Sequence, residues 1–351
     1  MQSHPSSTPM VRGCRCLSVV LAALVVAVIG ANAGAANRGF PRPPVSKIVT
    51  ISNAGLSVTF KISWGVVVVG IANKNVAHGL NIVNANDVGR KLQVDRFLSR
   101  RIHGRLELMI NPTQAGAEGG QGYNQHPKGI AIPEKGSPVV RWSVSGYHFH
   151  AVIKPWNYDT GHPTRFVYVE DVGINSRGVS HFHYTFYDHE PKKYVMGTEV
   201  PTLYSDRTNA FMYPPTCPYT RPNAAYHKGK VSAWPVKLVI ESPSWPQLGI
   251  ASKGWIANID TGDNLGIFYT TPVGLSEIFG TFRAADVGVF DTPPLGKTTV
   301  TANVTSYPGE VYSIDVSVLV STPKKGSALI SRQPPAVLKA IDNIPPARRQ
   351  P

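Results

Sequence analysis

A nine-residue stretch decides the fold that the sequence predicts: Val179-Ser-His-Phe-His-Tyr-Thr-Phe-Tyr187. It is rich in aromatic and β-branched residues, which favour β-strands. Side chains on a strand point alternately to opposite faces, so the apolar and polar residues of this stretch separate. One face holds Phe182, Tyr184 and Phe186, and the other holds His181, His183, Thr185 and Tyr187. We therefore expect a strand with one face toward a core and one face able to do chemistry.

The rest of the chain also has the residue pattern of short β-strands. Short apolar runs are separated by Gly, Pro, Asn and Asp from residue 46 to residue 321, and no long window has a helical period. With 32 Gly and 30 Pro, this pattern is typical of an all-β protein with two facing sheets. Nothing resembling a linker interrupts it, so we predict one large β-sandwich domain over residues 46–322. The Pro-rich segments 37–45 and 323–351, the second of them basic, are expected to be flexible.

The first 36 residues have the pattern of a secretion signal. Arg12 and Arg15 precede an apolar run at 17–29, and small residues follow it. The run is shorter than the roughly 20 residues that span a bilayer, so we expect cleavage, a secreted extracellular protein and no later membrane span. Cys217 is then the only cysteine left, which excludes an intramolecular disulfide. Asn303-Val-Thr305 is a glycosylation sequon.

The chain is basic. Its formal net charge of +14 falls to +12 when the two signal arginines are removed. Lys and Arg are scattered singly or in pairs, which argues against nucleic-acid binding. Carbohydrate, in particular anionic polysaccharide, is the partner that this charge suits. The alternative is that the charge mainly aids solubility.

Glu199 follows the histidine strand. Pro191 breaks that strand, and Pro201 favours an extended backbone just before it. We therefore expect Glu199 to project beside His181 and His183. A carboxylate and an imidazole in one cleft suit acid–base chemistry on a sugar.

A second polar segment lies at residues 81–93. Amide, carboxylate and guanidinium groups match the hydroxyl groups of a sugar, because they donate and accept hydrogen bonds in fixed planes. A solvated turn is the alternative. The residues that we place in a sugar site are Asn84, Asn86, Asp87, Arg90 and Gln93.

Other segments add candidates for sugar binding. The Gly-rich segment 106–128 is too long for a tight hairpin and is expected to shape the site. Aromatic rings can stack on the apolar face of a sugar, although most aromatic residues of a sandwich belong to its core. The candidates from these segments and from the end of the histidine stretch are Gln114, Glu190, Tyr204 and Trp255.

His148 and His150 form a second His-x-His pair on a predicted strand. Imidazoles two residues apart on a strand point the same way, so this pair and the pair at His181 and His183 can hydrogen-bond to a sugar. A divalent metal on these four side chains is one alternative, and ordinary strand histidines are another. We favour sugar binding and predict no metal and no other cofactor.

Asp260-Thr-Gly262 resembles the catalytic loop of aspartic proteases. Those enzymes need two such loops, so that two aspartates share a proton, and this chain has one. A β-turn is the better interpretation.

Four segments taken together resemble a group of secreted proteins with a galactose-mutarotase-like β-supersandwich. The segments are Asn84–Gln93, Asn111–Gly116, Glu199–Tyr204 and Gly254–Tyr269. The resemblance implies a carbohydrate cleft on a concave sheet and does not fix a reaction. Mutarotases use histidines and a glutamate base around the sugar, so it implies His181, His183 and Glu199 as catalytic residues.

Two hypotheses about function follow. The first is a secreted glycosidase, lyase or epimerase that acts on a polysaccharide, with Glu199 paired to Asp87, Glu190 or a histidine as the second acid or base. The second is a non-catalytic secreted protein that binds a glycan or a cell wall through the same cleft.

Overall fold

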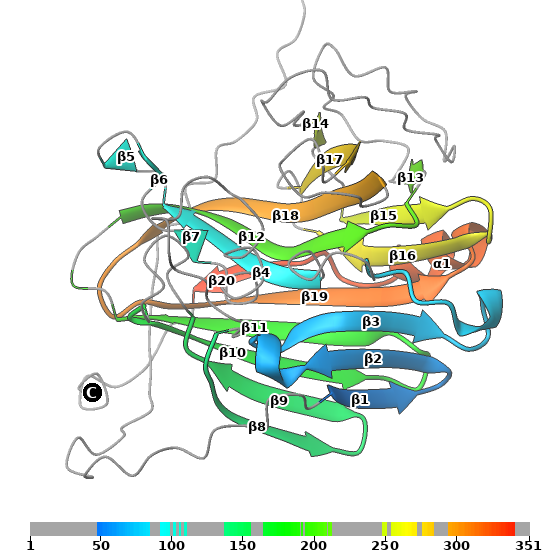
Figure 1. The fold of residues 1–351 in the computed structure, drawn as a ribbon, viewed down its shortest axis with the longest axis horizontal. Coiled ribbons are helices and arrows are strands. Elements are labelled where there is room, and N and C mark those ends of the chain that lie inside the picture. The colour runs from blue at the N-terminus through cyan, green and yellow to red at the C-terminus, as the bar shows by residue number, and fades with distance from the viewer. Residues whose placement is uncertain are drawn as a thin grey trace, which may run out of the picture.

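The computed structural model describes residues 48–84, 92–98, 101–102, 105–106, 109–110, 137–155, 164–189, 191, 194–208, 210–212, 248–250, 254–271, 276–283 and 294–340. Within these ranges the chain forms two nine-stranded sheets and a separate two-stranded one. All described strand pairs are antiparallel, which confirms the predicted all-β sandwich (Figure 1). The predicted domain boundaries stay a prediction.

The first sheet contains the N-terminal strands. Its order is β1 (Ile48–Asn53), β2 (Leu56–Lys61), β3 (Val67–Asn73), β4 (Leu92–Leu98), β12 (Tyr194–Ser205), β18 (Pro294–Ser306), β17 (Ser276–Arg283) and β14 (Leu248–Ile250). β7 (Met109–Ile110) pairs with β4. The short strands β5 (Arg101–Ile102) and β6 (Arg105–Leu106) pair with each other.

The second sheet carries both histidine pairs. Its order is β13 (Ala210–Met212), β15 (Trp255–Asp260), β16 (Leu265–Thr270), β19 (Val311–Ser321), β11 (Ser180–Asp188), β10 (Phe166–Ile174), β9 (His148–Ile153) and β8 (Val139–Ser145). β20 (Leu338–Ala340) pairs with β19. The helices are α1 (Pro323–Ile330) and the 3₁₀ turns η1 (Ile62–Trp64) and η2 (Ala77–Gly79).

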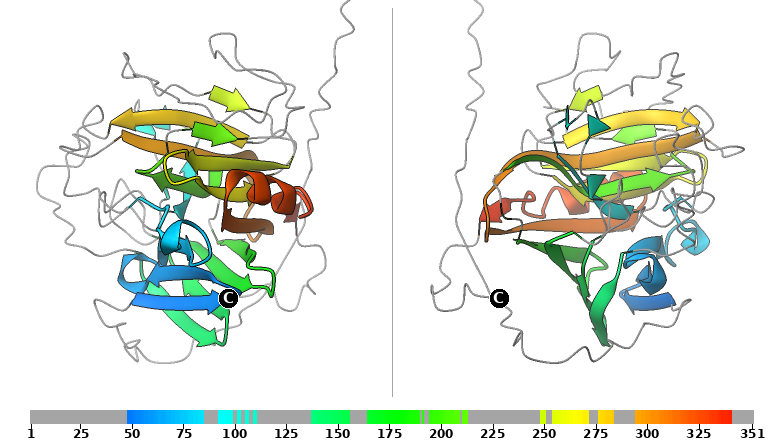
Figure 2. Two further views of the ribbon diagram at one scale, coloured as in Figure 1. Left: turned by 90° about the vertical axis from the view of Figure 1, so that its right-hand side faces the viewer. Right: turned by 60° about the vertical axis from the view of Figure 1, so that its left-hand side comes forward.

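The two sheets pack face to face around one apolar core. Figures 1 and 2 show the blue strands β1–β3 lying against the green strands β8–β11. Phe60 of β2 stacks on Phe149 of β9 with ring centroids 4.0 Å apart. Side chains also cross-link the sheets through backbone carbonyls: Asn53 Nδ2 donates to Ile174 O at 2.9 Å, and Tyr168 Oη donates to Gly65 O at 3.2 Å. The interface between the two sheets is therefore stabilised both by buried apolar side chains and by hydrogen bonds of buried polar groups.

β11 behaves as its sequence predicts. Its aromatic side chains are buried in the core, whereas His181 is exposed and His183 is half-buried on the opposite face. Phe186 extends the aromatic packing to Tyr312 of β19, with centroids 5.2 Å apart. The period-two pattern therefore fixes which face of the second sheet is polar.

Residues 323–340 correct the expectation that the segment 323–351 is flexible, and residues 341–351 lie outside the described residues. Residues 323–330 form α1, which packs on β16 and β19, and Leu338–Ala340 adds a strand to β19. Ile330 is buried, and a Cβ at Gly326 would come within 2.1 Å of the Phe268 ring. Apolar burial at these two positions overrides a local composition that suggests disorder.

The Asp260-Thr-Gly262 segment is a β-turn, as predicted. It joins β15 to β16, and Asp260 Oδ1 accepts hydrogen bonds from the backbone of Gly262 at 3.0 Å and Asp263 at 3.3 Å. Arg207 pairs with both aspartates. These carboxylates stabilise the turn.

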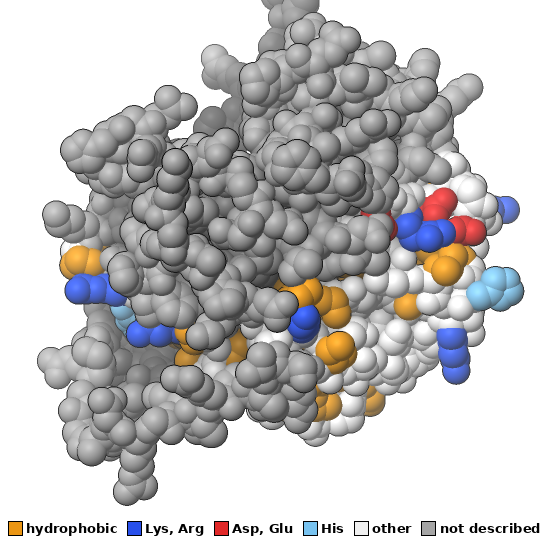
Figure 3. All heavy atoms as spheres, viewed as in Figure 1, with side chains coloured by type: hydrophobic (Ala, Val, Ile, Leu, Met, Phe, Trp, Pro, Cys, Tyr) orange, Lys and Arg blue, Asp and Glu red, His pale blue; other side chains and the backbone are white. Residues whose placement is uncertain are grey.

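Helix is scarce in the part of the chain that the structure describes. α1 is its one α-helix and has 8 residues. None of the described helices is long and apolar enough to cross a membrane. On the face drawn in Figure 3, the described Lys and Arg side chains lie in separate places rather than in a stripe.

Glu170 gives the fold a pH dependence. It lies on the core face of β10, 3% exposed, and no described Lys or Arg forms a salt bridge with it. Burial raises the pKa of Glu170 well above its ordinary value, and the Asp171 carboxylate raises it further. A carboxyl group in such a site stays protonated because the charged form loses its hydration.

We expect Glu170→Gln to stabilise the protein at pH 7 and to have little effect at pH 4. An unfolded Glu ionises near pH 4.3, and below that pH the group is protonated in both states. Above it only the unfolded chain ionises, so the free energy of unfolding falls by about 1.4 kcal/mol for each pH unit until the folded pKa is reached. Urea unfolding of both proteins between pH 4 and pH 8 measures this. Parallel pH profiles for the two proteins would contradict it.

Candidate functional site

The polar face of the second sheet brings both His-x-His pairs together. β9 and β11 flank β10, and the strand register places Asp171 opposite both His150 and His183. In the next row Gly173 lies opposite both His148 and His181. The expectation that each pair shares one strand face is confirmed, and the structure adds that the two pairs share a single surface.

A groove of ≈ 620 Å³ runs over this surface. That volume lies within the usual range for small-molecule sites, about 300–1,000 Å³. The polar groups that line it come from β1, β8, β9, β10, β11 and the turn between β10 and β11. They are Asn53, Ser143, Ser145, Tyr147, His148, His150, Asp171, Asn175, Ser176, His181 and His183.

His150 is oriented by a carboxylate. Its Nδ1 lies 2.6 Å from Asp171 Oδ1. A carboxylate at Nδ1 holds the proton there and leaves Nε2 as the basic nitrogen. No described residue hydrogen-bonds to that Nε2, and the side chain is 34% exposed. His150 therefore offers an accessible proton acceptor with a fixed orientation.

His183 has a similar carboxylate but no free ring nitrogen. Its Nδ1 lies 2.6 Å from Asp315 Oδ1 on β19, and its Nε2 lies 3.1 Å from Thr185 Oγ1. Thr185 is buried, so this hydroxyl is not available to a ligand. Both nitrogens of His183 are used within the protein.

His181 is also satisfied by its neighbours. Asn175 Oδ1 accepts hydrogen bonds from the backbone of Arg177 and Val179, so its Nδ2 must be the group that donates to His181 Nε2 at 3.0 Å. Nδ1 then carries the proton and donates to Ser317 Oγ at 3.0 Å. Burial lowers the pKa of His181, against an opposing effect of Asp315, so the ring is held neutral.

The two pairs differ in how many of their ring nitrogens are bound by protein groups. His181 and His183, predicted to be catalytic, are bound on both nitrogens by protein groups. His148 and His150, predicted to bind substrate, have ring nitrogens without a partner among the described residues. His150 is the imidazole of the groove that has a carboxylate at Nδ1 and no described hydrogen-bond partner at Nε2.

A tyrosine on the same face of β11 is influenced electrostatically by Asp171. Tyr187 is on the polar face of β11, and burial raises its pKa, Asp171 raises it further and Arg141 lowers it. Its phenol therefore stays protonated at neutral pH and can donate a hydrogen bond.

Among the residues that the structure describes, no three His, Cys, Asp or Glu side chains are arranged to hold a metal ion. Asp171 and Asp315 each contact a histidine Nδ1 directly. Each contact engages only one nitrogen of its ring, and the absence of a metal stays a prediction.

Glu199 is not beside the histidine strand, and this expectation was wrong. β12 pairs with β4 and β18 in the first sheet, whereas β11 is in the second. Glu199 is 6% exposed, and its Oε2 accepts a hydrogen bond from Thr202 Oγ1 at 2.7 Å. The following strand in sequence joined the opposite layer of the sandwich, which local pattern does not reveal.

Four further candidates lie in the first sheet, next to it or in a core. Asn84 is buried and its backbone N–H donates to Tyr204 O at 2.9 Å, and Tyr204 is buried as well. Gln93 of β4 lies opposite Thr202 of β12. Trp255 is 5% exposed in a second apolar cluster beside Phe268, so it is corrected from a sugar platform to a core residue. The candidates that lie outside the described residues are Asn86, Asp87, Arg90, Gln114 and Glu190.

Sequence reasoning missed the partners of the histidines. Asp171 and Asp315 are carboxylates inside mostly apolar strands, on the faces that carry the polar side chains. Their position is a usable signal, because a carboxylate is costly to bury and is therefore expected on the polar face of a strand. Asn175 and Ser317 carry no comparable signal in the sequence.

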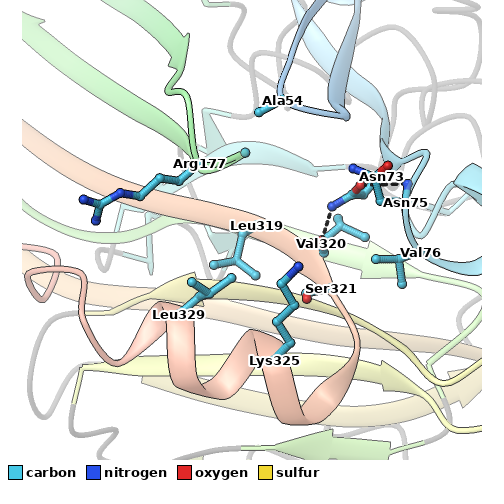
Figure 4. A pocket seen from close by; sticks show the side chains of 11 residues that line it. Ala54, Asn73, Asn75, Val76, Arg177, Leu319, Val320, Ser321, Lys325 and Leu329 are labelled. Atoms are coloured by element: carbon cyan, nitrogen blue, oxygen red, sulfur yellow. Dashed lines mark hydrogen bonds between the residues drawn. The ribbon is translucent and has the colours of Figure 1, made fainter.

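A second hollow is too small for a sugar. It has a volume of ≈ 60 Å³ and lies where α1 meets β19 and the turns after β1, β3 and β10. Figure 4 shows Lys325 pointing into it and Arg177 pointing away, while Asn73 Nδ2 donates to Val320 O at 2.8 Å. A space of this size holds a few waters.

We expect His181 to titrate below its ordinary pKa of 6.5 and to carry its proton on Nδ1 when neutral. Burial penalises the charged ring, and Asn175 donates to Nε2, which leaves Nδ1 as the donor. Because the folded pKa is lowered, this group contributes stability that is present above about pH 6.5 and is lost as the pH falls. Imidazole ¹⁵N and ¹H NMR across pH 4–8 reports both properties. An Nε2–H tautomer, or a pKa above 6.5, would show that the network differs.

Comparison with known proteins gives a likeness of fold only. No protein-family model matches the chain, and no curated protein matches it. Similar solved structures include an aldose epimerase homologue from C. elegans, with 13% identity, 79% of this chain and 99% of that chain covered, and a TM-score of 0.48. A putative aldose 1-epimerase from Escherichia coli K12 has 12% identity, 79% and 99% coverage, and a TM-score of 0.46.

The chain spans 37% of the 4-alpha-glucanotransferase from Thermococcus litoralis, which covers 78% of this chain at 9% identity and a TM-score of 0.42. With TM-scores below 0.5, these likenesses carry no conclusion about the family or the activity of this chain.

Proposed function

We propose that the chain is an extracellular carbohydrate-active protein that binds a sugar in the histidine groove and transfers a proton through His150. Secretion rests on the signal pattern of the first 36 residues. The sugar site rests on the groove, whose hydroxyl, amide and imidazole groups suit a polyol.

One observation carries the catalytic part of the proposal. His150 combines a carboxylate at Nδ1 with a partly exposed side chain whose Nε2 has no hydrogen-bond partner among the described residues. The other paired imidazole, His183, uses its Nε2 for Thr185. Orientation by a carboxylate and access to solvent are the two properties that a general base needs.

His150 Nε2 removes a proton from a hydroxyl or an activated C–H of the bound sugar, and the resulting imidazolium is stabilised by Asp171. The carboxylate stays ionised and orients the ring throughout. When the proton comes from the anomeric hydroxyl, that oxygen becomes a carbonyl, the bond from the anomeric carbon to the ring oxygen breaks, and the imidazolium gives the proton to the ring oxygen. Reclosure on the other face of the carbonyl, with these proton transfers reversed, completes an epimerisation. When the proton comes from an activated C–H, a C=C bond forms as the bond to the leaving oxygen breaks, and the imidazolium gives the proton to that oxygen, which completes an elimination. Both are proton-transfer reactions, to which a positioned base contributes about 10²–10⁴-fold.

The described groove favours proton transfer over glycoside hydrolysis. Glycosidases use two carboxyl groups that face the scissile bond. Asp171 is the one carboxylate among the described lining residues, and it is engaged by His150. We therefore place epimerase chemistry ahead of the glycosidase alternative. It also stands ahead of lyase chemistry, because the described lining has no Lys or Arg to neutralise the carboxylate that acidifies the C–H of a uronate.

The same lining favours a neutral sugar unit. It contains no Lys or Arg among the described residues, and His181 is held neutral. A uronate carboxylate would meet no permanent positive charge there. Attraction to an anionic polysaccharide, if measured, is then a property of the basic surface outside the groove.

Non-catalytic glycan binding is the second candidate. Tyr147 at the groove is 45% exposed, and exposed aromatic rings beside polar groups are suited to stacking on a sugar ring. Such a site binds without any role for a basic nitrogen.

We expect His150→Gln to lower the turnover of a sugar substrate by about a hundredfold or more while glycan binding is kept, because Gln retains polarity but not basicity. His183→Gln is the matched control, since it removes the other imidazole opposite Asp171. That variant should lower the melting temperature and keep most of the turnover per folded molecule. Turnover is read on a glycan panel as anomer exchange by NMR, unsaturated products by absorbance and reducing ends.

The two variants separate the candidates. Equal losses of turnover in both would remove His150 from its proposed role. Saturable glycan binding that both variants weaken, with no turnover in the wild-type protein, would establish the binding candidate instead.

Glu199→Gln tests the sequence-based hypothesis that Glu199, which lies in the first sheet, is the catalytic acid or base. Its carboxylate is buried and accepts from Thr202, so we expect a lower melting temperature and a turnover per folded molecule within about threefold of wild type. A hundredfold loss of turnover with unchanged stability would restore Glu199 as the base and place the site on the first sheet.

A further inference from the structure

We infer that His148 is a second ligand-contacting residue of the groove and that Gly173 is the positioning residue that makes room for it. The inference rests on the proposed function for the identity of the ligand. Its geometric part rests on the described residues alone.

Gly173 stands in the interior of β10, where glycine is unfavourable. Glycine has no side chain to pack, and its backbone loses more conformational entropy on folding than that of any other residue. Its backbone does not lie in the left-handed region, so conformation does not explain the glycine. A glycine in a strand is often the mark of a close approach by another group.

The group that approaches is the ring of His148. A Cβ on residue 173 would lie 2.7 Å from His148 Nδ1 and 2.9 Å from Cε1. Real contacts to Cβ are essentially never this short, so an alanine would push the ring away. The imidazole of His148 therefore lies across the β10 backbone, on the floor of the groove.

Packing rather than hydrogen bonding holds this ring. Tyr147 lies against it with ring centroids 4.6 Å apart and an interplanar angle of 42°. Neither ring nitrogen of His148 has a hydrogen-bond partner among the described residues. The ring therefore keeps hydrogen-bonding capacity for a hydroxyl group of a ligand.

The position relative to His150 gives this ring its role. Both histidines project from β9 to the same face, and Gly173 and Asp171 are their partners in adjacent rows of β10. A sugar ring over Gly173 would hydrogen-bond to His148 while presenting an adjacent group to His150. His148 thus selects how the sugar is oriented, and His150 moves the proton.

The experiment is a double-mutant cycle of Gly173→Ala and His148→Ala. In the wild-type background, Gly173→Ala should weaken binding of the panel sugar with the highest affinity by about tenfold, since it displaces the ring. In the His148→Ala background, the same change should have less than a twofold effect, because no ring remains to be displaced. Melting temperatures should stay within a few degrees of wild type, since alanine is tolerated in strands better than glycine.

A second measurement does not depend on a ligand. The His148 ring protons lie close to the Tyr147 ring, so their chemical shifts should move toward solvent-exposed values in Gly173→Ala and in Tyr147→Ala. Unchanged shifts in Gly173→Ala would overturn the positioning role. An equal loss of sugar binding from Gly173→Ala in both backgrounds would overturn it as well, since the glycine would then act without His148.

The two arms also separate this inference from the proposed function. If no sugar of the panel binds while the ring shifts respond as expected, the proposed function fails and the contact role of His148 fails with it, but the placement of His148 by Gly173 stands. If sugar binds and is turned over while the cycle shows no coupling, the proposed function stands and this inference fails.

Discussion

The strict alternation of side chains along β11 is the constraint on which the rest of the structure depends. Phe182, Tyr184 and Phe186 belong to the core on one face, and the histidines occupy the other. A slip of one residue would bury the imidazoles and expose the aromatic rings, at a cost of several kcal/mol for each ring. Because the aromatic face packs against β19 and β10 as well as the first sheet, the register of the neighbouring strands is fixed with it. The groove is the consequence on the outer face.

The two His-x-His pairs show how neighbouring strands decide the chemistry of identical motifs. β11 lies between β10 and β19, and β19 supplies Asp315 and Ser317, which bind the histidines beside them. β9 lies between β10 and β8, and β8 places only the small hydroxyl residues Ser143 and Ser145 opposite His150 and His148. The pair on the central strand β11 has its ring nitrogens occupied by side chains of neighbouring residues. The pair on β9, nearer the edge of the sheet, keeps ring nitrogens for a ligand.

Local pattern and nonlocal pairing explain what could be predicted from the sequence. The strand faces of β11, the turn at Asp260 and the all-β class follow from period-two alternation and turn residues, which are properties of short segments. The contact between His183 and Asp315 joins residues 132 positions apart, and no local signal encodes it. Glu199 was misplaced for the same reason, since the strand after β11 crosses to the other sheet. α1 likewise becomes ordered through its contact with β16, which its own composition does not indicate.

Glu170 and Asp171 show, on consecutive residues of β10, why the outer face is the place for chemistry. Glu170 points into the core, where burial raises its pKa and keeps it protonated, so it can serve neither as a base nor as a partner for a cation. Asp171 points to the groove, is 45% exposed and binds His150. A carboxyl group thus lowers the free energy of unfolding when it lies on the core face, and it orients a base when it lies on the outer face. Because the interior of the sandwich is apolar, the carboxylates that can act on a ligand are those on the same strand face as the histidines. Alternate residues share a face, so the sequence shows which carboxylates these are once the core face of one strand is known.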